Sequence, residues 1–303
     1  EGVLRRPVHG GALIALQMEN RGEAVAPRPW DVRIQPVGHS SQPLPSHRRI
    51  VDVFDEFGGS LLVLGAPGAG KTTTLLELTH DLILRALERP SSPIPAVFNL
   101  SSWAQHSLPL ADWMVVSLKR QYDADFEVAK SLIFGNKILP LLDGLDEVPI
   151  EHRVAARDAI NAFRVERGSV QVVVCSRTAE YEMLTAATDA RRQDDPTARL
   201  ALGGAIFIQP LSALQIDTYL SQVGAPLAGL SQAMGADSDL RELAESPLML
   251  SVMSLAYENT PLDAIVSPLD IWSEATALDS GARRTNRQRH LFDTWVDKMF
   301  TRD

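Results

Sequence analysis

A loop with three glycines, placed between an apolar run and a helix-forming segment, constrains this chain more than any other feature. The apolar residues 61–64 lead into Gly-Ala-Pro-Gly-Ala-Gly-Lys-Thr at residues 65–72. This sequence fits the pattern G-x-x-x-x-G-K-[ST] in the strand–loop–helix context that a phosphate-binding loop requires. Glycines let the backbone approach a phosphate, and N–H groups at the start of the following helix point at the same anion. The pattern therefore predicts a nucleotide-binding domain.

The residue types in the loop predict how a nucleotide is held. Lys71 is expected to neutralise the β- and γ-phosphates, and the Thr72 hydroxyl to coordinate Mg²⁺. The alternative is an ordinary Gly-rich turn with a solvated Lys71, which the complete motif in this context disfavours. We assign nucleotide binding to Gly65, Ala66, Pro67, Gly68, Ala69, Gly70, Lys71, Thr72 and Thr73.

Strands alternate with helices through the middle of the chain. After the loop strand, short apolar or β-branched runs occur at 94–100, 138–142, 170–176 and 205–208. This alternation predicts an α/β fold with a parallel sheet and right-handed crossovers. The pattern becomes wholly helical after residue 210. The expected organisation is a proline-rich N-terminal linker (1–49), a nucleotide-binding α/β domain (50–210), a helical domain (211–259), and a linker with the start of another domain (260–303).

Charged residues follow two of the predicted strands. In open α/β sheets, ligands bind beyond the carboxyl ends of the strands. We expect Asp143 to bind Mg²⁺ through water, and Asp146 or Glu147 to orient or deprotonate an attacking water. Arg177 closes the next strand and is expected to contact the γ-phosphate. The alternatives are helix capping for the acidic pair and a structural ion pair for Arg177.

Composition narrows the class of protein. The net charge of −9 provides no general electrostatic footprint for nucleic acid. The single cysteine, Cys175, excludes an intrachain disulfide and fits a reducing, cytoplasmic compartment. No apolar stretch has the length of a membrane span, and the histidines lack metal-ligand spacing. A basic cluster is interpreted as a solvated linker because no aromatic residues interleave with it: Arg283, Arg284, Arg287 and Arg289.

Four segments of the chain together resemble the NACHT branch of the STAND signalling NTPases. They are the phosphate loop, the acidic block at 139–147, the Cys-Ser-Arg strand end at 175–177, and Ser-Pro-Leu-Met-Leu at 246–250. Their order and spacing match the family across about residues 50–257. The loop alone indicates only a P-loop NTPase. The specific feature is the acidic block, with the small residue Gly144 after its first aspartate.

The resemblance implies an ASCE-type P-loop NTPase fold with a five-stranded parallel sheet in the order 5-1-4-3-2, followed by a small all-helical domain. It implies that Pro247 touches the adenine or ribose, and Val51 precedes the loop in a segment that often lies near the base. A winged-helix domain with a phosphate-binding histidine normally follows. His290 is only a weak candidate for that histidine, and the first residue, Glu1, indicates that the chain was cut from a longer protein.

In proteins of this family, ADP locks a closed monomer, and exchange for ATP permits oligomerisation. The leading hypothesis is therefore an ATP/ADP- and Mg²⁺-dependent switch with slow hydrolysis, which self-associates in its ATP state and has a role in bacterial immunity. Gly144 supports slow hydrolysis because many motor ATPases carry a glutamate there. The sensed ligand and the effector are expected outside this chain. The alternatives are a working ring ATPase or phosphotransferase, and a nucleotide-stabilised scaffold without hydrolysis.

Overall fold

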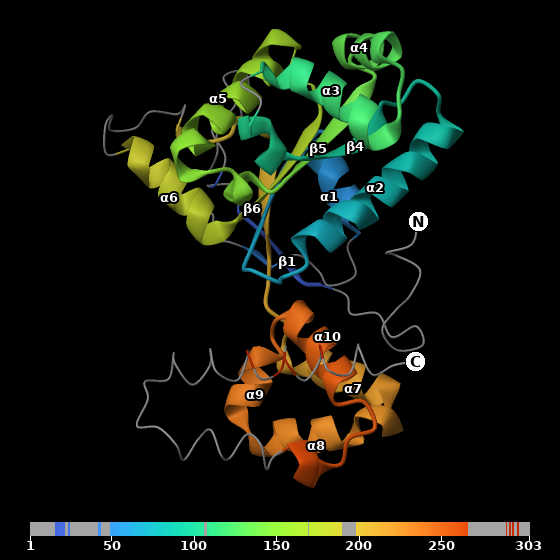
Figure 1. Ribbon diagram of the computed structural model, residues 1–303, viewed down its shortest axis with the longest axis vertical. Coiled ribbons are helices and arrows are strands. Elements are labelled where there is room, and N and C mark those ends of the chain that lie inside the picture. Colours follow the sequence, from blue (N-terminus) through green and yellow to red (C-terminus); the bar gives the residue numbers. More distant parts are fainter. Residues whose placement is uncertain are drawn as a thin grey trace. The chain divides into compact units, whose positions relative to one another are not determined.

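The computed structural model describes residues 16–21, 24, 42–43, 49–105, 108–168, 170–189 and 198–265, and positions 289, 291, 293 and 296. They fall into two compact units. One comprises residues 17–66 and 70–209, and the other includes the described residues from Pro210 onward. Figure 1 shows the first as an α/β unit and the second as a group of helices. The expectations for His290, Arg283, Arg284 and Arg287 lie outside the described residues.

Five parallel strands form the centre of the α/β unit. They are β3 (Ser60–Gly65), β4 (Ile94–Asn99), β5 (Ile138–Asp143), β6 (Val172–Arg177) and β7 (Gly204–Ile208). Their order across the sheet is β7-β3-β6-β5-β4, which is the predicted order 5-1-4-3-2. Every residue of β3 is buried, as expected for a strand covered on both faces.

The whole sheet differs from the predicted five-stranded, all-parallel sheet, because it has seven strands and is mixed. β1 (Met18–Asn20) pairs antiparallel with β7, and β2 (Gln42–Pro43) pairs antiparallel with β1. Both added strands lie in the range expected to be a linker. The physical reason is the outer edge of β7, which offers backbone groups for pairing to any nearby extended segment. A buried Met18 stands opposite Ile208 at this edge.

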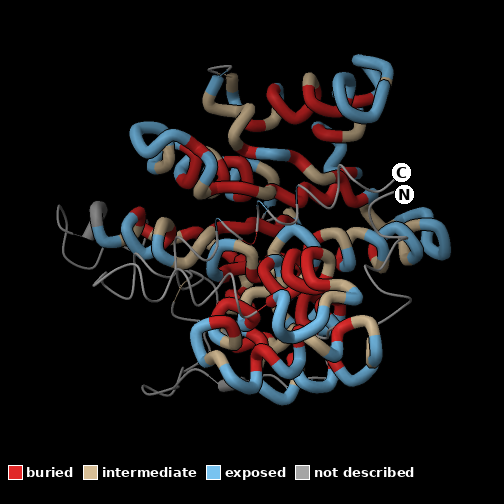
Figure 2. Tube along the Cα trace, turned by 60° about the horizontal axis from the view of Figure 1, so that its bottom comes forward, coloured by how far each residue is buried: buried red, intermediate tan, exposed pale blue. Residues whose placement is uncertain are grey.

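Helices cover both faces of the sheet (Figure 1). On one face, α2 (Lys71–Glu88) packs against β4, β5 and β6 and contacts α1 (Ile50–Glu56). The other face is covered by α3 (Leu110–Tyr122), α4 (Phe126–Phe134), α5 (Ile150–Glu166) and α6 (Thr178–Asp189). These four helices share one core cluster with Leu62, Leu64, Val172 and Val174 of the central strands. Figure 2 colours the chain by burial, and its buried stretches lie inward of the exposed ones.

The second unit is wholly helical among its described residues. It contains α7 (Ala213–Val223), α8 (Ala228–Ala236), α9 (Ser238–Leu243) and α10 (Pro247–Ala256) around an apolar core. Ser212 and Gln215 form a capping box at the start of α7. Ser246 stands at the N-cap position of α10, but its side chain makes no capping hydrogen bond. None of the helices in the described parts is both long and apolar enough to cross a membrane.

Candidate nucleotide-binding site

The phosphate loop joins the end of β3 to the start of α2. Gly68 and Gly70 adopt positive φ angles of 72° and 96°, a region that residues with a Cβ rarely enter. Gly70 is the N-cap of α2, and the first helical turn carries no acidic residue. The first turn of this 18-residue helix therefore has no carboxylate that could compete with a phosphate. Its unpaired N–H groups and its positive dipole end remain available to an anion. This geometry suits the binding of a phosphate.

The Lys71 side chain folds back over the loop. Its Nζ donates hydrogen bonds to the carbonyl oxygens of Gly65 and Ala66, both at 3.0 Å. Burial lowers the pKa of the Lys71 ammonium, and the nearby Asp146 carboxylate opposes that change. Removing water from the ammonium makes an added anionic partner more favourable than it would be at an open surface. Lys71 is thus held at the loop, in the place expected of a phosphate ligand.

Thr72 connects the start of α2 to the carboxyl end of β5. Its Oγ1 donates a 2.9 Å hydrogen bond to Oδ2 of Asp143. A hydroxyl and a carboxylate are the hard oxygen ligands that Mg²⁺ prefers, and protein Mg²⁺ sites commonly use one or two such groups with water and phosphate oxygens. The described residues contain no cluster of three or more metal-binding side chains. The pair Thr72 and Asp143 fits the expected Mg²⁺ position beside a nucleotide phosphate.

Asp146, the middle residue of η3 (Leu145–Glu147), forms a close pair with Arg177, the last residue of β6. The backbone N–H of Arg177 donates to Oδ1 of Asp146 at 3.0 Å, and its Nε lies 2.9 Å from Oδ2. The Asp146 side chain is only 6% exposed, whereas that of Arg177 is 43% exposed. Both carboxylate oxygens of Asp146 are therefore committed to Arg177. This arrangement suits holding the arginine in place better than deprotonating water.

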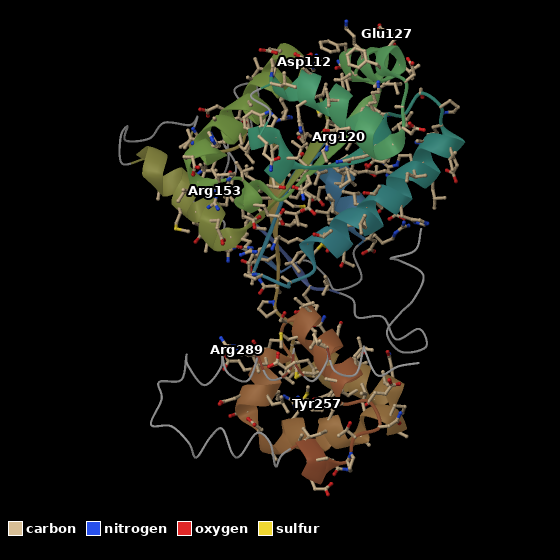
Figure 3. The ribbon with its side chains drawn as sticks, viewed as in Figure 1. Asp112, Arg120, Glu127, Arg153, Tyr257 and Arg289 are labelled. Atoms are coloured by element: carbon tan, nitrogen blue, oxygen red, sulfur yellow. The ribbon has the colours of Figure 1, made fainter. Side chains whose placement is uncertain are left out.

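Arg153 fixes the turn that carries the acidic pair. It extends from α5, as Figure 3 shows, and its guanidinium donates to the backbone oxygens of Asp146 and Val148 at 2.6 and 2.9 Å. These bonds hold η3 against the start of α5. Arg153 is not among the residues predicted for the site. It lies seven residues from Asp146, and nothing in the local pattern shows that a helical arginine turns back onto the preceding loop.

Glu147 occupies a different environment from Asp146. Its Oε2 accepts a 3.3 Å hydrogen bond from the side-chain amide of Asn99, which closes β4. A Cβ built on Gly144 would lie 2.9 Å from the Glu147 carboxylate, so the absence of a side chain at Gly144 makes room for it. Gly144 also has a φ of 77°. The structure thus distinguishes the two acidic residues, and Glu147 is the one whose carboxylate is available at the strand ends.

The proximity of the Glu147 carboxylate to Gly144 changes what residue 144 implies about the rate of hydrolysis. In the sequence alone, the absence of a glutamate at that position indicates slow hydrolysis. In the folded chain, the carboxylate of Glu147 lies against the point where a side chain at Gly144 would begin. A carboxylate is therefore present at the end of β5 although residue 144 does not supply it. The identity of residue 144 alone does not predict a slow rate.

Asn99 was missed as a site residue although the same argument would have identified it. It stands beside Asp143 in the register of β4 and β5, at the carboxyl edge of the sheet. Its Oδ1 accepts a 2.8 Å hydrogen bond from the N–H of Ser101, which fixes the amide with its donor side toward Glu147. Charged residues at strand ends are a strong sequence signal for a ligand site, and a neutral asparagine lacks that signal.

Two further residues remain predictions as base or ribose contacts. Val51 is buried on α1 of the α/β unit. Pro247 is the first residue of α10 in the helical unit, where a proline costs no intrahelical hydrogen bond. Thr73 follows Thr72 in the first turn of α2 and is exposed.

No protein-family model and no curated protein matches the sequence. Solved structures that match include the Aeropyrum pernix ORC1 protein in complex with DNA, with a TM-score of 0.46, and Caenorhabditis elegans PCH-2, with a TM-score of 0.36. Each has 13% sequence identity and covers 69% of this chain. The match spans 57% of the ORC1 chain and 62% of the PCH-2 chain. The α/β unit has the P-loop architecture on its own evidence, from its strand–loop–helix segment and the order of its parallel strands.

Proposed function

We propose that the chain binds ATP and ADP with Mg²⁺ at the carboxyl edge of its parallel sheet, and that it hydrolyses ATP there. The observation that carries this proposal is the joint placement of Thr72 beside Asp143 and of Glu147 beside Asn99. The first pair offers oxygen ligands for a metal ion, and the second offers a carboxylate for an attacking water. Lys71 at the loop supplies the charge that the phosphates need.

We further propose that the nucleotide acts as a switch, as in NACHT proteins, with self-association in the ATP state. The support is the sequence resemblance together with the pairing of Arg177. That arginine contacts Asp146 and Glu180, so a γ-phosphate near it would compete for a side chain that already bridges η3 and α6. A switch requires different affinities of ATP and ADP for two arrangements of the chain. The role in bacterial immunity rests on the resemblance alone.

A second candidate function is that of a working ATPase with continuous turnover. The contact between Glu147 and Gly144 favours it, since a carboxylate is available at the end of β5. The two functions differ in rate and in concentration dependence. A switch turns over slowly and changes its oligomeric state with the nucleotide, whereas a working enzyme turns over steadily with its substrate.

The first experiment is to denature the purified chain and identify any released nucleotide by ion-pair chromatography. Near-stoichiometric ADP supports the switch and makes nucleotide exchange the step to study. Steady ATP hydrolysis at a rate independent of protein concentration, with no change in mass by light scattering, contradicts the switch and leaves the working ATPase. Failure of both ATP and ADP to raise the unfolding temperature at concentrations far above a micromolar Kd contradicts nucleotide binding itself.

A further inference from the structure

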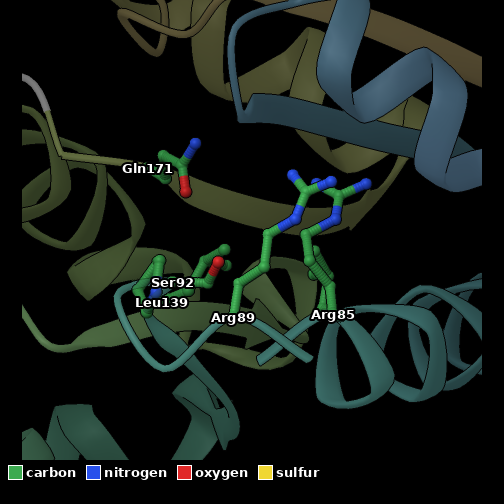
Figure 4. A pocket seen from close by; sticks show the side chains of 7 residues that line it. Arg85, Arg89, Ser92, Leu139 and Gln171 are labelled. Atoms are coloured by element: carbon green, nitrogen blue, oxygen red, sulfur yellow. The ribbon is translucent and has the colours of Figure 1, made fainter. Parts of the chain in front are cut away.

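A pocket with both polar and apolar lining lies at the amino edge of the same sheet, opposite the phosphate loop. Its volume is about 210 Å³, and it is lined by Leu82, Arg85, Arg89, Ser92, Pro93, Leu139 and Gln171. Pro93 directly precedes β4, Gln171 directly precedes β6, and Leu139 is the second residue of β5. Figure 4 shows the two arginines on one side of the pocket and Gln171 on the other. None of these residues belongs to the candidate nucleotide site.

The two arginines are held one helical turn apart. The backbone N–H of Arg89 donates to the carbonyl oxygen of Arg85 at 2.9 Å, at the C-terminal end of α2. The guanidinium of Arg85 makes two 2.7 Å hydrogen bonds to the carboxylate of Asp55. The side chain of Arg89 has no hydrogen bond or ion pair within the described parts of the chain. The nearby carboxylates of Asp55, Asp81 and Asp52 act on Arg85.

Two further side chains at the pocket also lack described hydrogen bonds. They are the hydroxyl of Ser92 and the amide of Gln171. With Arg89 they line one space, which Gln171 reaches from a segment distant in the sequence. The backbone N–H of Ser92 donates to the carbonyl oxygen of Arg89 at 2.9 Å, which holds these two residues in one turn. A guanidinium offers only donors, and a hydroxyl and an amide can both donate. The complementary ligand accepts hydrogen bonds and carries negative charge.

The size of the pocket restricts that ligand. Sites for drug-sized molecules have volumes of about 300 Å³ or more, and this pocket has about 210 Å³. The pocket is therefore too small to enclose a whole nucleotide, whereas an ion of the size of phosphate fits. The C-terminal end of α2 carries a partial negative charge of about half an electron, which repels an anion. The unit positive charge of Arg89 is larger and outweighs it. A planar guanidinium group can bind a phosphate through two parallel N–H···O hydrogen bonds.

We propose that this pocket is a second anion site, which binds a small oxyanion of the size of phosphate. The site is separate from the phosphate loop. The helix α2 has 18 residues and begins at the loop with Lys71, while Arg85 lies in its last turn. At 1.5 Å per residue, the helix spans about 27 Å, so one ligand cannot contact both ends.

The test is a titration of the ¹⁵N-labelled chain with inorganic phosphate at constant ionic strength, followed by TROSY NMR. The backbone amides of Ser92 and Gln171 report the pocket, and those of Gly70 and Lys71 report the loop. Saturable shifts at Ser92 and Gln171 at millimolar phosphate support the second site. The amides of the loop and those of the pocket respond independently of each other. The proposed nucleotide site and the proposed second anion site are therefore tested separately.

The matched variants are Arg89→Gln and Arg120→Gln. Arg120 is an exposed arginine in the last turn of α3, outside the pocket, and is labelled in Figure 3. Because hydrogen bonds to charged groups are among the stronger ones, Arg89→Gln is expected to weaken phosphate binding at the pocket about tenfold or more. Arg120→Gln is expected to leave it unchanged. An absence of saturable shifts at the pocket, or equal effects of the two variants, overturns the proposal.

Discussion

The substitution Gly144→Ala tests whether Glu147 is the residue that acts on water. A Cβ on Gly144 would lie 2.9 Å from both Cδ and Oε2 of Glu147. Ordinary carbon contacts are at about 3.5–4.0 Å, so the carboxylate has to move by about 0.6–1 Å. A displacement of about 1 Å in a catalytic group lowers the rate by about 10²-fold. The φ of 77° is unfavourable for alanine, so the substitution is also expected to lower the free energy of unfolding by about 1–2 kcal/mol.

The control variant is Gly168→Ala, two residues after the end of α5. Gly168 also has a positive φ, 68°, but a Cβ there meets nothing within 4 Å. Both variants are expected to lower the unfolding temperature by about 2–4 °C for each kcal/mol lost, and only Gly144→Ala is expected to reduce kcat. Single-turnover hydrolysis of ATP and calorimetry measure the two effects. If Gly144→Ala keeps kcat within about twofold of Gly168→Ala, a difference of less than about 0.4 kcal/mol, Glu147 does not act as inferred.

Three further predictions concern single residues. Lys71→Ala is expected to abolish the thermal shift caused by Mg²⁺-ATP. It is not expected to lower the unfolding temperature of the free chain, since burial already disfavours the Lys71 ammonium. A large loss of stability without nucleotide contradicts this prediction. Asn99→Ala is expected to lower kcat by about three- to tenfold with ATP affinity unchanged, because it removes the donor to Glu147; parallel binding and single-turnover measurements check it, and an unchanged kcat refutes it. Burial raises the pKa of Tyr181 to about 12, above its value of 10.0 in the unfolded chain. The unfolded chain therefore loses this proton first, and stability falls as pH rises from about 10 to 12. Tyr181→Phe is expected to make that fall less steep, by up to about 1.4 kcal/mol per pH unit in urea unfolding, and an unchanged slope contradicts the assignment.

The central strands could be predicted because their sequences carry the signal of burial on both faces. Residues 172–174 are three consecutive valines, and all of them are fully buried in β6. The short strands β1 and β2 could not be predicted in this way. The segment Met18–Asn20 has only three residues and no alternating pattern, and it becomes a strand by pairing with β7. Its structure depends on a partner that lies almost two hundred residues away in the sequence.

In the candidate site, too, some features follow from short sequence patterns, and others depend on residues far apart in the sequence. The loop and the strand-end residues follow from local patterns, and the fold brings Thr72 and Asp143 into contact. The sequence left Asp146 and Glu147 as alternatives, since both follow β5 in the same acidic block. They are distinguished by contacts with β6 and β4, to Arg177 and Asn99 respectively. No pattern within the acidic block indicates which neighbour each carboxylate meets.

The pairing of Arg177 indicates how a γ-phosphate would be sensed at this site. Its backbone N–H and Nε contact Asp146, and its NH1 lies 3.5 Å from Glu180 on α6. The remaining terminal nitrogen has no partner within the described part of the chain. In the proposed ATP complex, we therefore expect the γ-phosphate to bind NH2 and attract NH1 while the bonds to Asp146 persist. The contact that gives way is then the longer and weaker one to Glu180, because its partner is more exposed than Asp146. We expect the difference between ATP and ADP to reach the rest of the unit through α6, with η3 and the carboxylate of Glu147 kept in place for hydrolysis.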